Sequence, residues 1–300
     1  MSSPHLSMMT RRAVLFGPLA LLAARAADAA GKMTLSLHQQ TSAGAGYRKS
    51  LEGWARAGIK NVELTGAALD EFLKSDALPA ARRVLTDLGL TPVSGASGAA
   101  GVWEPGPNRQ AAVDTFTRRC EMFAALGLTR LYAPSVATQP FTEDDYKTGA
   151  DNMREVGAIA ARFGMTAMVE ATRASTFIAS LPTMLTLTRA AGNVAPLLDC
   201  YHFWSGPSKI EDLDLIRPGE IGHVHFQDTP AGPRELLAQA TRAIPGDGVA
   251  PLVAILRKLA SKGYAGPLSV ELFLPKYTQG DPFEVVRAWL ARQRVARSAD

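Results

Sequence analysis

The chain has little cysteine and histidine, no basic cluster and no glycine-rich phosphate loop, and each shortage removes a class of protein. Two cysteines cannot build a disulfide scaffold, and five histidines are too few for a site with several zinc ions. An apolar run, Ala13–Ala24, is too short to cross a bilayer of ~30 Å as a helix. The remaining composition, 47% hydrophobic and 20% charged, is typical of a globular protein.

The positive charge is concentrated at the N-terminus. The net charge is +4, and Arg11, Arg12 and Arg25 against Asp28 place half of it in residues 1–30. Residues 31–300 contain no basic run interleaved with aromatic residues. We therefore expect no nucleic-acid partner.

Residues 1–30 have the pattern of an export signal. Arg11-Arg12 precedes the weakly apolar run, and Ala26-Ala27-Asp28-Ala29-Ala30 offers a small-residue cleavage region. The arginine pair resembles a twin-arginine signal, with a general secretory signal or an uncleaved anchor as the alternatives. We expect a periplasmic or secreted protein without stable membrane insertion after cleavage, whose catalytic domain spans residues 31–300.

After residue 31, short β-rich runs alternate with longer amphipathic runs. Their starts recur about every thirty residues, the length of one strand–helix unit. The expected strands are Met33–His38, Lys60–Thr65, Thr91–Ala96, Thr129–Ala133, Thr166–Ala171, Val194–Cys200, Ile221–Gln227 and Pro267–Phe273.

The segments between these runs have helical spacing. Two examples are Asp151–Phe163 and Leu252–Leu259, and glycines that fit helix C-caps precede five strands: Gly58, Gly89, Gly127, Gly164 and Gly192. Eight strands and eight helices predict a single-domain (β/α)₈ TIM barrel. A doubly wound sheet is the alternative fold, but the first strand runs into His38-Gln39-Gln40-Thr41 without the glycine-rich turn of that fold.

The two cysteines fall in different layers of such a barrel. Cys120 lies on an expected outer helix and Cys200 at the end of an expected strand. This separation favours two free, buried thiols over a disulfide, although an exported protein could pair them.

Four consecutive strands carry an acidic or imidazole side chain at the same end. These residues are Glu170, Asp199, His225 and Glu271. In a barrel, active residues lie at the carboxyl ends of the strands, and apolar neighbours would bury these groups unless they are paired or bound to a metal. Three carboxylates and one histidine suit Mn²⁺, Co²⁺ or Mg²⁺ better than a structural Zn²⁺. We predict one divalent metal ion held by all four.

The order of these residues resembles the xylose-isomerase-like superfamily of sugar phosphate isomerases and epimerases. The similarity includes Val62-Glu63-Leu64, Asp199 to His202, His223 to His225, Val270-Glu271 and the turn Pro245-Gly246-Asp247-Gly248. It implies the same four metal ligands, with Glu170 and Glu271 as catalytic acid and base on either side of the substrate. It also implies that His202 contacts a substrate oxygen.

The chain departs from the epimerase pattern at two places. Arg173 and Thr176 stand where epimerases carry a second glutamate after the fifth strand. The arginine that follows the H-x-H strand in some epimerases is missing at that offset, where Thr229-Pro230-Ala231 stands and Arg234 comes later. The two departures count against the specific assignment as an epimerase, whereas the predicted metal site does not depend on them.

Further substrate-binding candidates lie on the same rim. They are His38, Trp103, Trp204, Arg173 and Glu63. The tryptophans could stack on a sugar or pack in loops, Arg173 could bind substrate or a surface carboxylate, and Glu63 could line the pocket or form an ion pair inside the barrel.

The sequence therefore predicts a metal-dependent sugar isomerase or epimerase that acts through an enediolate. Phosphorylated sugars are mainly cytoplasmic, so export favours free sugars or their keto derivatives, and a lyase that performs β-elimination on keto-glycosides is the main alternative. A non-catalytic sugar-binding barrel is a further alternative, whereas a DNA repair endonuclease lacks the extra histidines it would need. Self-association into a homo-oligomer is left open.

Overall fold

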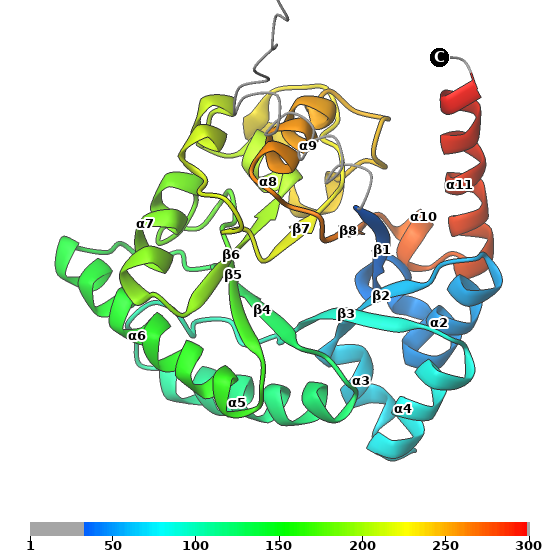
Figure 1. Ribbon diagram of the computed structural model, residues 1–300, viewed down its shortest axis with the longest axis horizontal. Helices are drawn as coiled ribbons and strands as arrows, with labels where there is room; N and C mark the ends of the chain where they lie inside the picture. The colour runs from blue at the N-terminus through cyan, green and yellow to red at the C-terminus, as the bar shows by residue number, and fades with distance from the viewer. Residues whose placement is uncertain (1–32, 299–300) are drawn as a thin grey trace, which may run out of the picture.

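Eight parallel strands form a closed barrel in the computed structural model, which describes residues 33–298, with only the helical backbone for 291–298 (Figure 1). The strands follow one another around the barrel in sequence order, and each overlaps one of the eight predicted strands. They are β1 (Thr34–His38), β2 (Asn61–Thr65), β3 (Thr91–Ala96), β4 (Arg130–Pro134), β5 (Thr166–Glu170), β6 (Val194–Asp199), β7 (His223–His225) and β8 (Pro267–Val270). The predicted TIM barrel is confirmed.

The export signal predicted for residues 1–30 lies outside the described residues. Within residues 33–298, no helix is both long enough and apolar enough to cross a membrane.

Helices surround the barrel on its outer side (Figure 1). They are α2 (Gly46–Arg56), α3 (Gly66–Phe72), α4 (Leu78–Asp87), α5 (Arg109–Ala125), α6 (Glu143–Arg162), α7 (Leu181–Ala191), α9 (Leu252–Ser261), α10 (Pro275–Thr278) and α11 (Pro282–Ser298). All five glycines predicted as C-caps have positive φ, and Gly192 ends α7 in the left-handed region with φ of 81°. Short 3₁₀ helices such as η1 (Gln39–Ala45) follow some strands.

The outer layer differs from the eight full helices predicted at one place. Between β6 and β7 stand only the short α8 (Cys200–Ser205) and the 3₁₀ helix η2 (Ile210–Leu215). Gly206-Pro207 follows α8 and Pro218-Gly219 follows η2, so neither segment has room to grow into a full helix.

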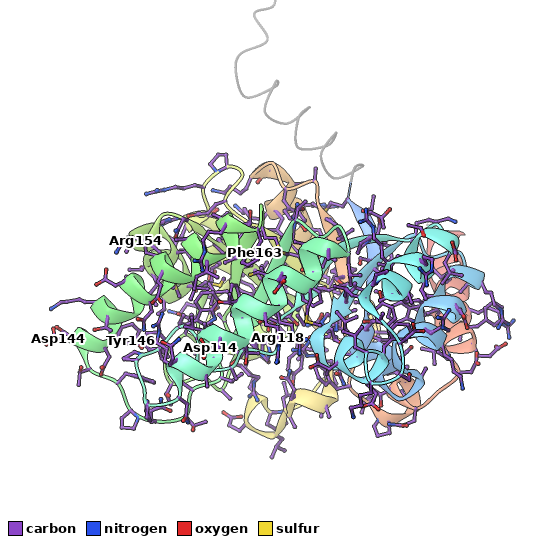
Figure 2. All side chains as sticks on the ribbon, turned by 90° about the horizontal axis from the view of Figure 1, so that it is seen from below. Asp114, Arg118, Asp144, Tyr146, Arg154 and Phe163 are labelled. Atoms are coloured by element: carbon purple, nitrogen blue, oxygen red, sulfur yellow. The ribbon has the colours of Figure 1, made fainter. Side chains whose placement is uncertain are left out.

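Helix α6 begins earlier than the predicted Asp151. Thr142 accepts a hydrogen bond from the Asp145 backbone N–H while the Asp145 carboxylate accepts one from the Thr142 N–H, a capping box that starts the helix at Glu143. Figure 2 shows α5 and α6 from the side, and exposed residues such as Asp114 and Asp144 mark their outer faces.

The inside of the barrel has an apolar half and a polar half. On β4 to β6, Tyr132, Met168 and Leu197 pack together, with Ala96 and Ala195 against them. On β7, β8, β1, β2 and β3 the corresponding inward positions carry fully buried polar side chains: His223, Ser269, Ser36, Glu63 and Ser94. Packing alone therefore fills only one side of the barrel core.

The two cysteines are free and buried, as predicted. Burial raises the pKa of the Cys120 thiol to about 12, and it also raises that of Cys200. Both thiols are therefore in their unreactive protonated form at neutral pH.

Candidate active site

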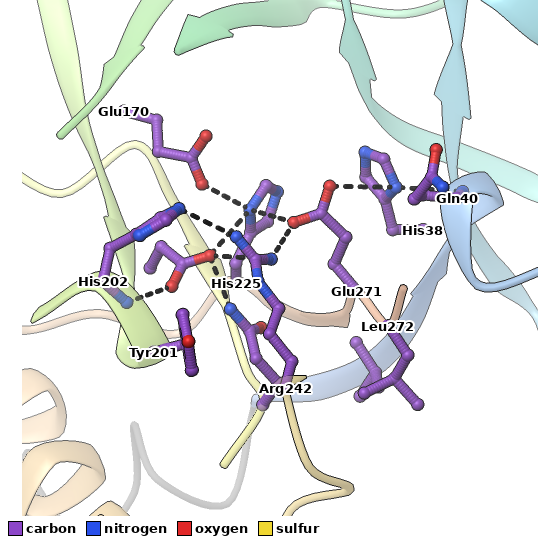
Figure 3. Close-up of polar contacts among 12 residues, drawn as sticks. His38, Gln40, Glu170, Tyr201, His202, His225, Arg242, Glu271 and Leu272 are labelled. Carbon is purple, nitrogen blue, oxygen red and sulfur yellow. Dashed lines mark hydrogen bonds and ion pairs between the residues drawn. The ribbon is translucent and has the colours of Figure 1, made fainter. Parts of the chain in front are cut away.

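The structure brings the four predicted metal ligands together at the mouth of the barrel (Figure 3). Glu170, Asp199 and His225 are the last residues of β5, β6 and β7, and Glu271 directly follows β8. Each is at most 5% exposed. One ligand atom from each residue lies within 4.8 Å of the others, so a single ion can contact all four.

His225 lies at the centre of this cluster. Its Nδ1 is 3.0 Å from Glu170 Oε1, 3.6 Å from Asp199 Oδ2 and 3.7 Å from Glu271 Oε2. Its Nε2 faces the other way, 3.2 Å from Glu63 Oε2 inside the barrel. Glu63 therefore forms the internal ion pair that was one of its two predicted roles, below the ligands rather than beside them.

Arg242 is a site residue that the sequence did not reveal. It is fully buried, its Nη1 donates to Glu271 and lies 3.1 Å from Asp199 Oδ2, and its Nη2 is 2.9 Å from His202 Nε2. The guanidinium also lies over the ring of Phe273, 4.8 Å from its centroid. No arginine stands directly after the H-x-H strand, as the sequence showed, and the arginine that reaches the cluster comes from further along the loop.

The loop between β7 and α9 delivers Arg242 in a fixed position. Asp228 and Ala243 form an antiparallel bridge, and the Asp228 carboxylate accepts hydrogen bonds from the backbone N–H groups of Gly246, Gly248 and Ala250. A Cβ on Gly248 would lie only 2.4 Å from Asp228 Oδ1. The turn Pro245-Gly246-Asp247-Gly248 thus closes the base of the loop that carries Arg242.

The carboxylates of the cluster have unequal electrostatic surroundings. Burial, followed by the negative charges of Asp199 and Glu271, raises the pKa of Glu170 to about 8 despite the nearby His225. Burial also opposes ionisation of Asp199 and Glu271, but Arg242 and the nearby histidines together outweigh it and lower the pKa of both. Glu170 is therefore the carboxyl group that holds a proton most readily.

The cluster has more negative than positive groups. Among the described residues, Arg242 and His225 are the cationic partners of Glu170, Asp199, Glu271 and Glu63, since burial lowers the pKa of His38 and His223. A buried excess of carboxylates is costly unless protons or a cation neutralise it. Three carboxylates and one histidine are suitable ligands for a divalent metal ion, and such an ion would also neutralise the excess negative charge.

His202 and His38, both predicted to contact the substrate, flank the cluster. The His202 N–H donates to Asp199 Oδ1 at 2.7 Å, and burial lowers the pKa of its ring to about 4, so the imidazole is neutral. His38 Nδ1 accepts from the Gln40 backbone N–H, which places its ring proton on Nε2, 3.1 Å from the Tyr132 hydroxyl. His38 Nδ1 also lies 3.5 Å from Glu271 Oε1.

Arg173 has no surface carboxylate partner among the described residues, in contrast to one of its two predicted roles. Its guanidinium donates to the backbone carbonyls of Arg234 and Leu237, and its Nε lies 3.4 Å from the Ser205 carbonyl oxygen. It binds neither a surface carboxylate nor the cluster. Instead, Arg173 ties the loop that carries Arg242 to the segment after β5.

The two tryptophans lie in loop packing, the alternative to a pocket wall. Trp103 is fully buried, its indole N–H donates to the Ala133 carbonyl, and its ring contacts Phe116 edge-on. Trp204 is half-buried on α8 with the Arg234 guanidinium 5.1 Å from its ring centroid. These contacts account for both rings without a substrate.

The sequence is similar to that of a known family and to curated enzymes. A model of the xylose isomerase-like TIM barrel matches residues 51–293. Inosose isomerase of Bacillus licheniformis is 29% identical over 58% of this chain and 65% of its own length. That of Halalkalibacterium halodurans is 38% identical over 32% of this chain and 34% of its own length. Each match thus spans less than two thirds of the curated relative.

Solved structures share the fold at low sequence identity. The IolI protein with a bound zinc atom has a TM-score of 0.80, with 22% identity over 87% of this chain and 96% of its own. D-allulose 3-epimerase from Methylomonas sp. in complex with D-allulose has a TM-score of 0.69, with 18% identity over 87% of this chain and 96% of its own. The probable 3-DHS dehydratase AsbF from Bacillus anthracis has a TM-score of 0.70, with 15% identity over 87% of this chain and 99% of its own.

Proposed function

Because the chain belongs to the xylose isomerase-like TIM-barrel family, we propose that it is a divalent-metal-dependent sugar isomerase or epimerase. The observation that carries this proposal is the convergence of three carboxylates and one histidine within 4.8 Å. The inosose isomerase relatives and the allulose-bound neighbour support a polyol ketone, such as an inosose or a ketose, as the substrate.

Glu170, Asp199, His225 and Glu271 would hold the metal. Three hard oxygen donors and one imidazole favour Mn²⁺, Co²⁺ or Mg²⁺, and the zinc in the IolI structure makes Zn²⁺ the fourth ion to test. When bound, such an ion would stabilise the negative charge that develops on a substrate oxygen as an enediolate forms.

The residues of the chain divide the proton transfer between them. Glu170 has no arginine partner, and its raised pKa suits it to accept a proton from the carbon beside the carbonyl. Glu271 is held ionised by Arg242 on the other side of His225, so it is placed to act as the second acid–base group. Arg242 and His202 are the hydrogen-bonding groups next to the substrate oxygens.

The test is hydrogen exchange at carbon. The protein is stripped of metal, reloaded separately with each of the four ions, and incubated in D₂O with D-allulose and with inososes, with loss of the C–H signal followed by NMR. We expect exchange with at least one ion, and a loss of about 10²–10⁴-fold in Glu170→Gln. Glu155→Gln, which changes an exposed carboxylate on α6, is the matched control. Absence of exchange with every ion and substrate refutes the proposal.

A lyase is the second candidate, because β-elimination begins with the same proton abstraction. The Arg11-Arg12 pattern supports export to a compartment with free sugars and keto-glycosides, and we propose a periplasmic or secreted location. The dehydratase-like neighbour AsbF agrees with this chemistry at the level of fold. The same experiment with 3-keto-glycosides distinguishes the two: deuterium in recovered ketose supports an isomerase, and release of the aglycone supports a lyase.

A further inference from the structure

Besides His225 Nε2, whose close contact is the ion pair with Glu63, five buried polar atoms in the polar half of the barrel have no hydrogen-bond partner within the described residues. They are Ser36 Oγ, Glu63 Oε1, Ser94 Oγ, His223 Nδ1 and Ser269 Oγ. All five residues are 0% exposed. Leaving so many buried groups unpaired would cost free energy comparable to the whole stability of a domain, so they require a partner.

These atoms come from five neighbouring strands and face a common space. His223 Nε2 reaches across the barrel to within 3.0 Å of Glu63 Oε2, which places both side chains in the interior. Ser36 is paired in register with Ser269, and Glu63 with Ser94. Ser36 and Ser269 lie two residues before His38 and Glu271, so their side chains share the inner face of their strands.

The chemistry of the five atoms calls for a partner that both donates and accepts. Glu63 Oε1 is an acceptor, and His223 Nδ1 is one as well, because Nε2 holds the ring proton toward Glu63. The three serine hydroxyls can each donate and accept, yet none lies within hydrogen-bond distance of the two acceptors. A cation would satisfy oxygens but leave the hydroxyl protons without acceptors, whereas water serves every member of the set.

The inner face of these strands carries small side chains at several positions. Inward positions of a TIM barrel usually carry bulky Val, Ile or Leu, and here three of them carry serine on β1, β3 and β8. A polar space of this kind, with several hydrogen-bonding groups around it, holds ordered water, whereas apolar cavities stay dry.

We propose that the polar half of the barrel interior binds a cluster of ordered water molecules that completes the hydrogen bonds of Glu63 and His223. Through these waters the three serines hold Glu63 in place, and Glu63 holds the ring of His225 with Nδ1 turned toward the carboxylate cluster. Glu63 is thus a positioning residue for His225, a role that rests on the proposed metal function, whereas the water site does not.

A high-resolution crystal structure of the full chain tests the water site directly. We expect density for water within ~3.2 Å of at least two of the five atoms. Direct hydrogen bonds among the five side chains, a dry void, or a cation with an anomalous signal at this position would each overturn the inference.

Solution measurements test the same site without a crystal. Oxygen-17 magnetic relaxation dispersion counts long-lived internal waters, and the count should fall in the triple variant Ser36→Ala, Ser94→Ala, Ser269→Ala. Ser135→Ala is the control, because Ser135 is equally buried but its hydroxyl bonds to Ser175. An unchanged count in the triple variant contradicts the proposal, and single serine variants replace the triple one if it does not fold.

Metal binding tests the positioning role separately. Glu63→Gln should weaken Co²⁺ affinity by about 10–100-fold and shift the visible absorption of the bound Co²⁺, while Glu155→Gln changes neither. An unchanged affinity and spectrum would remove Glu63 from this role. If the waters are present but the protein exchanges no substrate proton, the water site stands and the proposed function falls.

Discussion

The two halves of the barrel interior support the ligand cluster in different ways. Beneath Glu170 and Asp199, on β5 and β6, the apolar side chains Met168 and Leu197 fill the core by packing. Beneath His225 and Glu271, on β7 and β8, the core consists of polar groups: His223, which pairs with Glu63, and Ser269. The apolar half is filled by packing, whereas in the polar half an ion pair with Glu63 contacts the His225 ring.

The largest expected effect comes from emptying the apolar half. Met168→Ala should lower the free energy of unfolding by about 2–5 kcal/mol, because a fully buried side chain leaves a cavity. Ser94→Ala in the polar half should cost less than about 1 kcal/mol, because only one weakly held hydroxyl is lost. Urea unfolding of both variants measures the difference, and equal losses would show that the two halves are packed alike.

Arg242 joins the two halves, since it contacts Asp199 on β6 and Glu271 after β8. Arg242→Met should reduce turnover by about 10²–10³-fold, the usual loss when a buried hydrogen-bond donor to a developing charge is removed. Steady-state kinetics with the preferred substrate measures the loss, and Arg109→Met on the outer surface serves as the control. A turnover close to that of the wild type would place Arg242 outside the chemistry.

The unequal pKa values of the clustered carboxyl groups predict a metal affinity that depends on pH. Without metal, the pKa of Glu170 is about 8, raised by burial and its carboxylate neighbours, so Glu170 is protonated below that pH and a metal must displace the proton. Affinity for Mn²⁺ should therefore rise with pH up to about 8, by up to about tenfold per unit for each proton released. Calorimetry at several pH values tests this, and Glu170→Gln should flatten the dependence. A flat profile in the wild type would show that Glu170 is already ionised.

The smallest effect is expected at the rim. Arg173→Ala removes the hydrogen bonds to the carbonyls of Arg234 and Leu237, so the loop that carries Arg242 should become less ordered. We expect KM to rise severalfold while kcat changes little, because Arg242 can still reach the cluster. Steady-state kinetics separates the two terms, and a large loss of kcat with unchanged KM would instead assign Arg173 to the reaction itself.

The parts of the site that follow strand geometry could be predicted from the sequence. Glu170, Asp199 and His225 are recognisable because each ends a buried strand, and strand ends meet at one edge of the barrel. Arg242 had no such signal, because it lies in an irregular loop between His225 and α9 whose path depends on the Asp228 contacts.

Other errors arose from partners that a sequence does not display. Arg173 binds backbone carbonyls, which every residue carries, so no pattern could identify them. The three inward serines look like ordinary strand residues, and only the barrel register brings them next to Glu63 and His223. A full helix was predicted between β6 and β7 because eight regular strand–helix units were assumed, whereas the structure has only two short helical segments there.

The contacts of Asp228 separate this barrel into a fixed scaffold and an exchangeable insert. Asp228 fastens both ends of the excursion from Thr229 to Gly246, so its exposed part, residues 231–236, can lengthen, shorten or change composition while Arg242 and the four clustered side chains keep their positions. New specificity could thus evolve by replacing one surface cassette, without the loss of folding that core changes bring.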